Sequence, residues 1–460
     1  MPPACPKSAV QPRPFSHRDA GTPETTWLLD TRWDSVPRLP LVELCRQWPR
    51  VVLIAPHPDD ETLAVGATLS DLADAGVAVT VVIATHGGTP DAPPVRRQEG
   101  DRAIRALHPR IEAVWWDLPD GGLAAAERAM RAWLTALVDD STLVLAPIEC
   151  DGHTDHEAVA RAAEAIALAR SAALLLYPVW LWHWATPDDV EWDRARTLAP
   201  SLRALRAKRA AVECHSSQLS ADDGHPIVGP SVLTRAHRVF ETVFVPQHSE
   251  LAARVTGTLA NRERDEVARP FDAMYSTGES DPWRLDDSPY ERRRLRLLLA
   301  CLGRERYGRT LEIGCASGQL TSKLRERADV AVGLDASDAA LSVARARGDD
   351  VHWVLGAAPR DIPDEDYDLV VASEIGYFLD GVELLTTLRA VRGRLRPNGE
   401  FVVANWRRDT TDVPLDGPTV QQQIAEAIDL PRRARYEDVD LLIDVYGQPI
   451  SVYDEAGGDR

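Results

Sequence analysis

The chain has 460 residues, of which 44% are hydrophobic, which is enough for two average domains that each bury a core. Its formal net charge of −19 argues against polyanionic partners, because a negative surface repels nucleic acid and anionic membranes. Six cysteines without a C-x-x-C pair indicate free thiols in a reducing compartment, and no apolar run approaches the roughly 20 residues that cross a bilayer. We therefore expect a cytoplasmic protein that acts on a small molecule and binds neither nucleic acid nor membrane.

The N-terminal stretch is rich in proline and lacks the apolar region of a signal peptide, so we expect residues 1–25 to be mobile. Beyond it, strand-like and helix-like segments alternate twice, which predicts two Rossmann-like α/β domains, each a mostly parallel sheet flanked by helices. The predicted parts are an N-terminal extension at 1–47, a first domain at 48–247, a connector at 248–270, a second domain at 271–408 and a C-terminal extension at 409–460.

Short apolar runs mark the strands of both predicted domains, and a helix-like segment at 62–75 separates the first two. In the first domain the predicted strands are 51–55, 79–84 and 143–147, and in the second they are 311–314, 330–335, 369–372 and 400–404.

The run Ala55-Pro56-His57-Pro58-Asp59-Asp60-Glu61 places one imidazole and three carboxylates at the end of the first apolar strand. A second polar run, Asp151-Gly152-His153-Thr154-Asp155-His156, follows the strand at 143–147. Imidazole and carboxylate ligands hold a divalent ion, and open coordination positions admit water for metal-assisted hydrolysis. Polar loops that cap helices contain the same residue types. Two such runs at strand ends, where open α/β sheets bind their ligands, favour a metal site.

These two runs resemble the A-H-P-D-D-E-like and H-P-D-H-like motifs of the PIG-L/LmbE family of zinc-dependent N-deacetylases, and the resemblance extends over residues 48–247. It implies that His57, Asp60 and His156 ligate zinc and that Asp59 is the general base. Zinc lowers the pKa of bound water to about 7, and a neighbouring carboxylate that is not a ligand can take the water proton.

The same resemblance implies roles for residues around the ligands. His153 would stabilise the tetrahedral oxyanion, and Asp155 would orient an imidazole. Arg96 and Asp120 lie in further family-like segments and are implied to contact the substrate. The chain departs from the family pattern at Thr154, where proline is usual, and at residues 85–88, where an acidic segment is common.

A second signature lies downstream, where the run 310–318 reads as a strand that enters a glycine-rich turn. The next strand, 330–335, ends in an acid, and a further strand is predicted at 367–374. Glycine lets a ligand approach the backbone closely, and an acid at the following strand end can bind a ribose diol.

This set resembles class I S-adenosylmethionine-dependent methyltransferases, and segments between 265 and 405 resemble the nodulation-type N-methyltransferase branch, which acts on amino groups of deacetylated amino sugars. The resemblance implies that Glu312, Gly314 and Gly318 bind the methionine part of the cofactor and that Asp335 binds its ribose.

Three residues of these segments are candidates for the methyl-acceptor pocket: Trp283, Tyr290 and Glu374. For the two aromatic residues a place in the hydrophobic core is an equally good interpretation.

Together the two signatures predict a bifunctional enzyme that removes an N-acyl group from an amino sugar or a related small molecule with zinc and then methylates the exposed amine with S-adenosylmethionine. Two alternatives stay open. The methyltransferase acts on oxygen or on a separate substrate, or one domain is a binding module without catalysis.

Overall fold

The computed structural model describes residues 13–87, 95–221, 224–255, 264–275, 281–410 and 413–449. It divides into two compact units, residues 1–259 and 260–460. Each unit contains a seven-stranded sheet with helices around it, which confirms the predicted fold class. Among the described residues, none of the helices is both long enough and apolar enough to cross a bilayer.

The sheet of the first unit has the strand order β3-β2-β1-β4-β5-β7-β6. Its strands are β1 Arg50–Ala55, β2 Ala78–Thr85, β3 Glu112–Leu118, β4 Thr142–Pro147, β5 Ala173–Tyr177, β6 Ala195–Leu198 and β7 Glu241–Phe244. The first five in chain order run parallel, whereas β7 pairs antiparallel with β5 and β6. The central strands β1 and β4 read as continuous apolar runs because both of their faces are buried.

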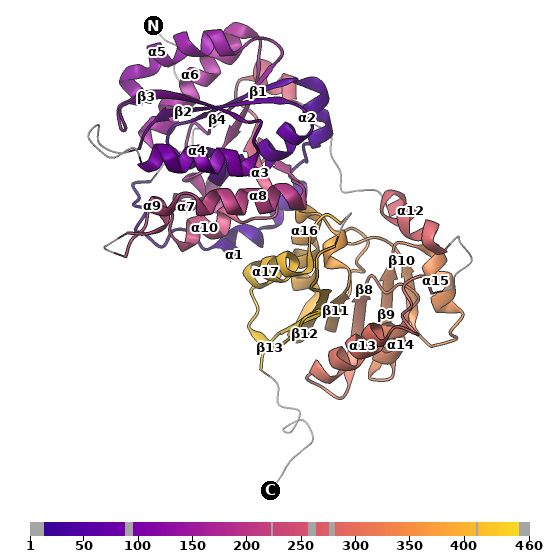
Figure 1. The fold of residues 1–460 in the computed structure, drawn as a ribbon. Coiled ribbons are helices and arrows are strands. Elements are labelled where there is room, and N and C mark those ends of the chain that lie inside the picture. The colour runs from indigo at the N-terminus through magenta and orange to yellow at the C-terminus, as the bar shows by residue number, and fades with distance from the viewer. Residues whose placement is uncertain are drawn as a thin grey trace. The chain divides into compact units, whose positions relative to one another are not determined.

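Helices α5 and α6 cover one face of this sheet, and α3, α4 and α8 cover the other (Figure 1). The helices of the unit are α1 Glu24–Leu28, α2 Leu41–Gln47, α3 Asp60–Asp74, α4 Val95–Leu107, α5 Leu123–Leu137, α6 Thr154–Arg170, α7 Leu181–Trp184, α8 Leu202–Glu213, α9 Ser216–Leu219, α10 Pro230–Ala236 and α11 Ser249–Ala252, with 3₁₀ turns at Thr31–Ser35, Pro187–Asp189 and Ala253–Val255.

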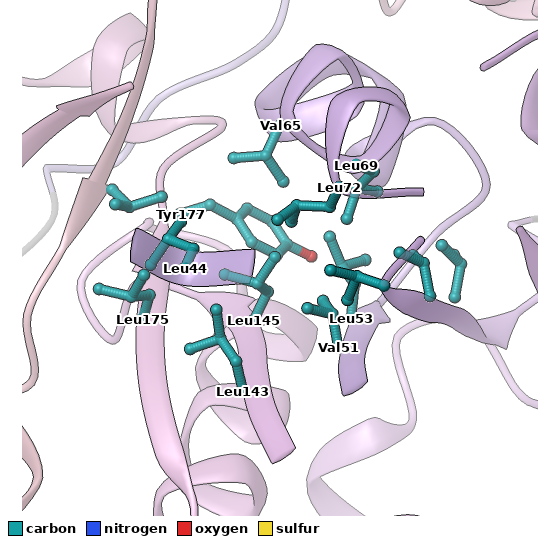
Figure 2. Packing of buried hydrophobic residues seen from close by; sticks show 14 of the residues in the cluster. Leu44, Val51, Leu53, Val65, Leu69, Leu72, Leu143, Leu145, Leu175 and Tyr177 are labelled. Carbon is teal, nitrogen blue, oxygen red and sulfur yellow. The ribbon is translucent and has the colours of Figure 1, made fainter. Parts of the chain in front are cut away.

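Buried apolar residues under α3 hold this helix on the sheet, with its start in the first polar run, residues 55–61. Val51 and Leu53 alternate along β1 and therefore point to the same face of the sheet. Val65, Leu69 and Leu72 follow the helical spacing and pack onto that face, as Figure 2 shows. The apolar pattern thus holds α3 in place with its first residue at the carboxyl edge of the sheet.

A kink in α3 is stabilised by a buried ion pair. The backbone leaves helical geometry at Val65, and the N–H groups of Ala67 and Thr68 donate to the Glu241 carboxylate at 3.0 and 2.8 Å. Lys208 Nζ donates to the same carboxylate at 2.7 Å, and both side chains are buried. Removing one partner of such a pair costs about 3–5 kcal/mol, so this contact anchors the helix that carries the metal motif.

The N-terminal residues differ from the sequence expectation. Residues 1–12 lie outside the described part of the chain, but residues 13–25, which were expected to be mobile, pack on the first unit. The backbone N–H of Thr22 donates to His183 O at 3.1 Å, and the fully buried Trp27 donates from its indole to Trp182 O at 3.0 Å. The anchoring residues are single aromatics in a proline-rich stretch, so no periodic pattern indicated the packing.

The sheet of the second unit has the order β10-β9-β8-β11-β12-β14-β13, with five parallel strands followed by two antiparallel ones. Its strands are β8 Tyr307–Ile313, β9 Ala328–Asp335, β10 His352–Leu355, β11 Tyr367–Ser373, β12 Leu395–Trp406, β13 Arg432–Glu437 and β14 Leu441–Tyr446. Its helices are α12 Arg264–Tyr275, α13 Pro289–Cys301, α14 Gln319–Arg325, α15 Asp338–Arg345, α16 Gly381–Arg394 and α17 Gly417–Ala427, with a 3₁₀ turn at Gly376–Phe378.

The predicted C-terminal extension contributes two strands, β13 and β14, to this sheet. Strand β14 pairs with β12, and its Leu441, Ile443 and Val445 are buried in the core of the unit. The sequence predicted a domain boundary after residue 408 because the stretch 409–418 is acidic and contains proline.

Candidate functional site

The two polar runs meet at the carboxyl ends of β1 and β4, which are neighbouring parallel strands. His57 follows β1, Asp60 begins α3, and His156 lies in the first turn of α6. Asp60 Oδ2 accepts a hydrogen bond from the His57 backbone N–H at 2.9 Å. The same oxygen lies 3.3 Å from His57 Nδ1 and 3.3 Å from His156 Nε2. The fold therefore brings together the three residues implied to ligate zinc.

The donor atoms around His156 fit a metal ion. Its Nδ1 lies 2.7 Å from Asp151 Oδ2, and the fully buried Asp151 also accepts the backbone N–H groups of Val179 and Leu181 at 3.0 and 2.8 Å. With its proton on Nδ1, the ring directs the Nε2 lone pair toward Asp60. This buried Nε2 has no hydrogen-bond partner within the described residues. A buried imidazole lone pair beside a carboxylate is a donor set that suits zinc.

Asp151 is a site residue to which the sequence assigned no role. It belongs to the second polar run, but spacing alone did not distinguish it from Asp155 as the carboxylate that orients His156. Its position five residues before His156 was the available signal.

The His57 ring has two carboxylates at its other nitrogen. Nε2 lies 3.0 Å from Asp120 Oδ1 and 3.4 Å from Asp155 Oδ2. Asp155 is fully buried and accepts the backbone N–H groups of Gly121 and Leu123 at 2.8 and 3.0 Å, so its position is fixed. Asp155 is therefore placed to orient His57. Asp120, which was predicted to contact the substrate, contacts the same Nε2 atom of His57.

Asp59 is buried beside the predicted zinc ligands, with a backbone φ of 141° that residues with side chains rarely adopt. Burial raises the pKa of its carboxyl to about 6, although the neighbouring Arg96 opposes this shift. Arg96 Nη2 donates to Asp59 Oδ2 at 3.1 Å and to Pro58 O at 3.0 Å. Arg96, predicted to contact the substrate, thus holds the predicted general base.

His153 caps α6 and faces the ligands. Its Nδ1 accepts the backbone N–H of Asp155 at 3.3 Å, which leaves the ring proton on Nε2 in the neutral form. Burial, together with repulsion from His156 and His57, lowers the pKa of His153 to about 4. Nitrogen atoms of His57, His153 and His156 all lie within 4.8 Å of one another, so His153 reaches the same space as the ligands.

A pocket in the second unit lies at the carboxyl ends of β8, β9 and β11, and Glu312, Gly314 and Asp335 line it as predicted cofactor contacts. Gly314 has a φ of +72°, and a Cβ there would lie 2.8 Å from the Ile375 side chain, so the turn admits only glycine. The Asp335 carboxylate accepts the backbone N–H groups of Ala316 and Ser337 at 2.8 and 2.9 Å. The turn and the acid are therefore held together at one end of the pocket.

Gly318 and Glu312, both predicted to bind the cofactor, also make contacts that hold the glycine turn and the strand before it. Gly318 begins α14 with a φ of +84°, and a Cβ there would lie 2.4 Å from the Trp353 ring. Gly318 does not itself line the pocket. Glu312 is buried, where it accepts a hydrogen bond from the Thr321 hydroxyl, and burial raises its pKa to about 8.

Two of the three predicted acceptor residues line the same pocket. Trp283 and Glu374 line its wall, and Trp283 packs near the rings of Phe271 and Phe378. Tyr290 does not line the pocket, but its hydroxyl donates to Glu374 Oε1 at 2.8 Å.

Comparisons with known proteins find a matching family for part of each unit. Residues 52–167 match the family described as PIG-L, GlcNAc-PI de-N-acetylase, and residues 275–412 match that of nodulation protein S, NodS. The chain is 29% identical over 171 residues to nodulation protein S of Rhizobium tropici, covering 36% of this chain and 69% of the relative. It is 30% identical over 131 residues to the Azorhizobium caulinodans protein, covering 28% of this chain and 63% of the relative. The N-methyltransferase NodS of Bradyrhizobium japonicum WM9, solved with S-adenosyl-L-homocysteine, is 26% identical, with 40% of this chain and 100% of that chain covered and a TM-score of 0.36.

Two α/β domains with a His/Asp centre and a glycine-turn pocket define a two-domain enzyme. The chain therefore joins a domain that matches the PIG-L, GlcNAc-PI de-N-acetylase, family to a domain that matches the nodulation protein S family.

Proposed function

We propose that this protein uses zinc in its first domain to remove an N-acyl group from an amino sugar and uses S-adenosylmethionine in its second domain to methylate the exposed amine. The observation that carries the proposal is the presence of both sites on one chain, a His/Asp donor set in a deacetylase domain and a carboxylate-lined pocket in a methyltransferase domain. The family description GlcNAc-PI de-N-acetylase supports an N-acetylated sugar as the first substrate.

In the first domain, His57, Asp60 and His156 would hold zinc, which supplies an activated water and a polarised carbonyl. The buried Asp59 carboxylate takes the proton of the attacking water and returns it to the departing amine. The Nε2–H of His153 donates to the carbonyl oxygen as it gains negative charge. Arg96 keeps Asp59 in position for both proton transfers.

The order of the two reactions follows from the electronic state of nitrogen. The lone pair of an acetamide nitrogen is delocalised into the carbonyl, so this nitrogen is a poor methyl acceptor. The amine that deacetylation releases has a localised lone pair and attacks a methyl group readily. The first reaction therefore creates the substrate of the second.

In the second domain, Asp335 would contact the cofactor ribose and no part of the metal centre. We expect Asp335→Ala to weaken S-adenosylmethionine binding by roughly tenfold to a hundredfold, because one charge-assisted hydrogen bond contributes about 1.5–3 kcal/mol. Calorimetric titration of the cofactor measures this change, and an amide hydrolysis assay on the same variant serves as the control. Unchanged cofactor affinity would show that Asp335 does not bind the ribose, and lost hydrolysis would show that the two domains depend on each other.

The coupled order is tested with the N-acetylated and the free forms of one amino sugar, each given to the wild type and to His57→Ala with S-adenosylmethionine. We expect the wild type to methylate both compounds and the variant to methylate only the free amine. Mass spectrometry detects loss of acetyl and gain of methyl on the same molecule. Methyl transfer to the intact acetamide, or to a hydroxyl while the free amine is ignored, would contradict the coupled proposal and leave two separate activities on one chain.

A further inference from the structure

Glu374 is held more firmly than a residue that merely lines a pocket. It follows β11 with a φ of +58°, a conformation that non-glycine residues rarely adopt, and such strain persists only where surrounding contacts impose it. Three elements supply those contacts. Tyr290 of α13 donates to Oε1 at 2.8 Å, while Tyr377 of the 3₁₀ turn and the backbone N–H of Trp406 on β12 donate to Oε2 at 2.6 and 3.1 Å.

These donors leave the carboxylate with one open position. An ionised carboxylate has two oxygens and about four lone-pair sites. Both sites on Oε2 are filled, and Tyr290 fills one of the two on Oε1. Within the described residues, no other side chain or backbone group donates a hydrogen bond to Glu374, and the residue lines the pocket.

We infer that the open site on Glu374 Oε1 accepts an N–H of the methyl acceptor, so that the second domain methylates primary and secondary amines but neither tertiary amines nor hydroxyl groups. This inference rests on the proposed methyltransferase function and narrows its substrate class. Tyr290 and Tyr377 are positioning residues, because they act on the acceptor only through the carboxylate.

The chemistry of the transfer explains the selectivity. A neutral amine, held through one N–H, forms the new nitrogen–carbon bond with its lone pair while the methyl–sulfur bond breaks and its electron pair stays on sulfur. The resulting ammonium passes the held proton to Glu374 and from there to water, so charge and atoms balance. A hydroxyl must lose its proton to become a comparable nucleophile, and a carboxylate is too weak a base to remove it. A tertiary amine has no N–H to place in the open site.

The inference sets an upper limit on methylation. A primary amine keeps one N–H after the first transfer, so it can be held a second time. After the second transfer none remains, and the reaction ends at the dimethylamine without a quaternary ammonium product.

The test compares four forms of one amino sugar that differ at a single position: the primary amine, the N-methylamine, the N,N-dimethylamine and the hydroxyl analogue. Mass spectrometry follows methyl transfer, and calorimetry measures binding of each compound to the protein saturated with S-adenosylhomocysteine. We expect turnover of the first two compounds only, and roughly tenfold weaker binding of the dimethylamine than of the N-methylamine, the effect of one charge-assisted hydrogen bond.

Three variants assign the effect to the carboxylate. We expect Glu374→Gln to lower kcat for the primary amine by roughly a hundredfold with unchanged S-adenosylhomocysteine affinity. Tyr377→Phe should lower kcat to a smaller extent. The control Tyr446→Phe, which removes a hydroxyl bonded to Asp444 of the same strand, β14, should change neither value.

A trimethylated product, equal binding of the N-methyl and dimethyl compounds, or full activity of Glu374→Gln would overturn the inference while leaving N-methylation intact. Methylation of the hydroxyl analogue in place of the amines would overturn both the inference and the proposed function.

Discussion

His156→Ala is expected to lose bound zinc and, with it, amide hydrolysis. The Nε2 of this residue is a buried imidazole nitrogen that has no hydrogen-bond partner in the described part of the chain, and Asp151 fixes the ring so that this lone pair faces Asp60. Alanine removes one of three proposed ligands, and the remaining two cannot hold the ion tightly. The metal contributes several kcal/mol to such reactions, so the rate should fall by at least about a thousandfold.

Metal content by mass spectrometry and the rate of acetate release measure the two losses. The matched control is His248→Ala, because His248 is exposed at the start of α11 and contacts no part of the centre. Full zinc content in His156→Ala would contradict the ligand assignment. Methyl transfer to a free amine should persist in both variants, and an unchanged melting temperature of the first domain shows that this domain still folds.

Asp59→Asn is expected to retain zinc and still lose most of the hydrolysis. Asparagine is close to aspartate in size and keeps a hydrogen bond with Arg96 within reach, but it cannot accept the water proton. A missing general base typically costs about 10²–10⁴-fold in kcat. Steady-state kinetics should therefore show the loss in kcat, with a much smaller change in KM.

Asp74→Asn is the control for this variant, because Asp74 lies exposed at the far end of the same helix. Loss of zinc from Asp59→Asn would make Asp59 a ligand, and an unchanged kcat would exclude it as the general base. The two outcomes therefore distinguish a role of Asp59 in binding the metal from a role in removing the proton of the attacking water.

The residues that hold the first site in place come from distant parts of the chain. Asp59 and Arg96 are 37 positions apart, and they meet because α4, which carries Arg96, packs beside α3, which starts directly after Asp59. Local spacing indicated that both are polar residues in family-like segments, but it did not indicate which group each one touches. The structure adds a hydrogen bond from Arg96, the predicted substrate contact, to Asp59, the predicted general base.

In the second site, too, the sequence indicated the residues, and only the structure showed their contacts. Tyr290 and Glu374 are separated by 84 positions. The sequence predicted both as candidates for one acceptor pocket, with a place in the core as the alternative for Tyr290. Their hydrogen bond depends on the placement of α13 beside the end of β11, which is a property of the packed sheet. Tyr377 is close to Glu374 in sequence, but its hydroxyl turns toward the carboxylate only in the folded 3₁₀ turn.

The sequence by itself determined the fold class, the strands that end in polar runs and the residue types of the metal centre and the glycine turn. These features depend on local periodicity and on residues that are neighbours in the chain, so they can be recognised without knowledge of the packing. Only the tertiary structure decided that Asp151 orients His156, that Asp155 orients His57 and that three donors leave one acceptor site on Glu374. Hydrogen bonds of this kind depend on atom positions within a few tenths of an ångström, and packing between distant segments sets those positions.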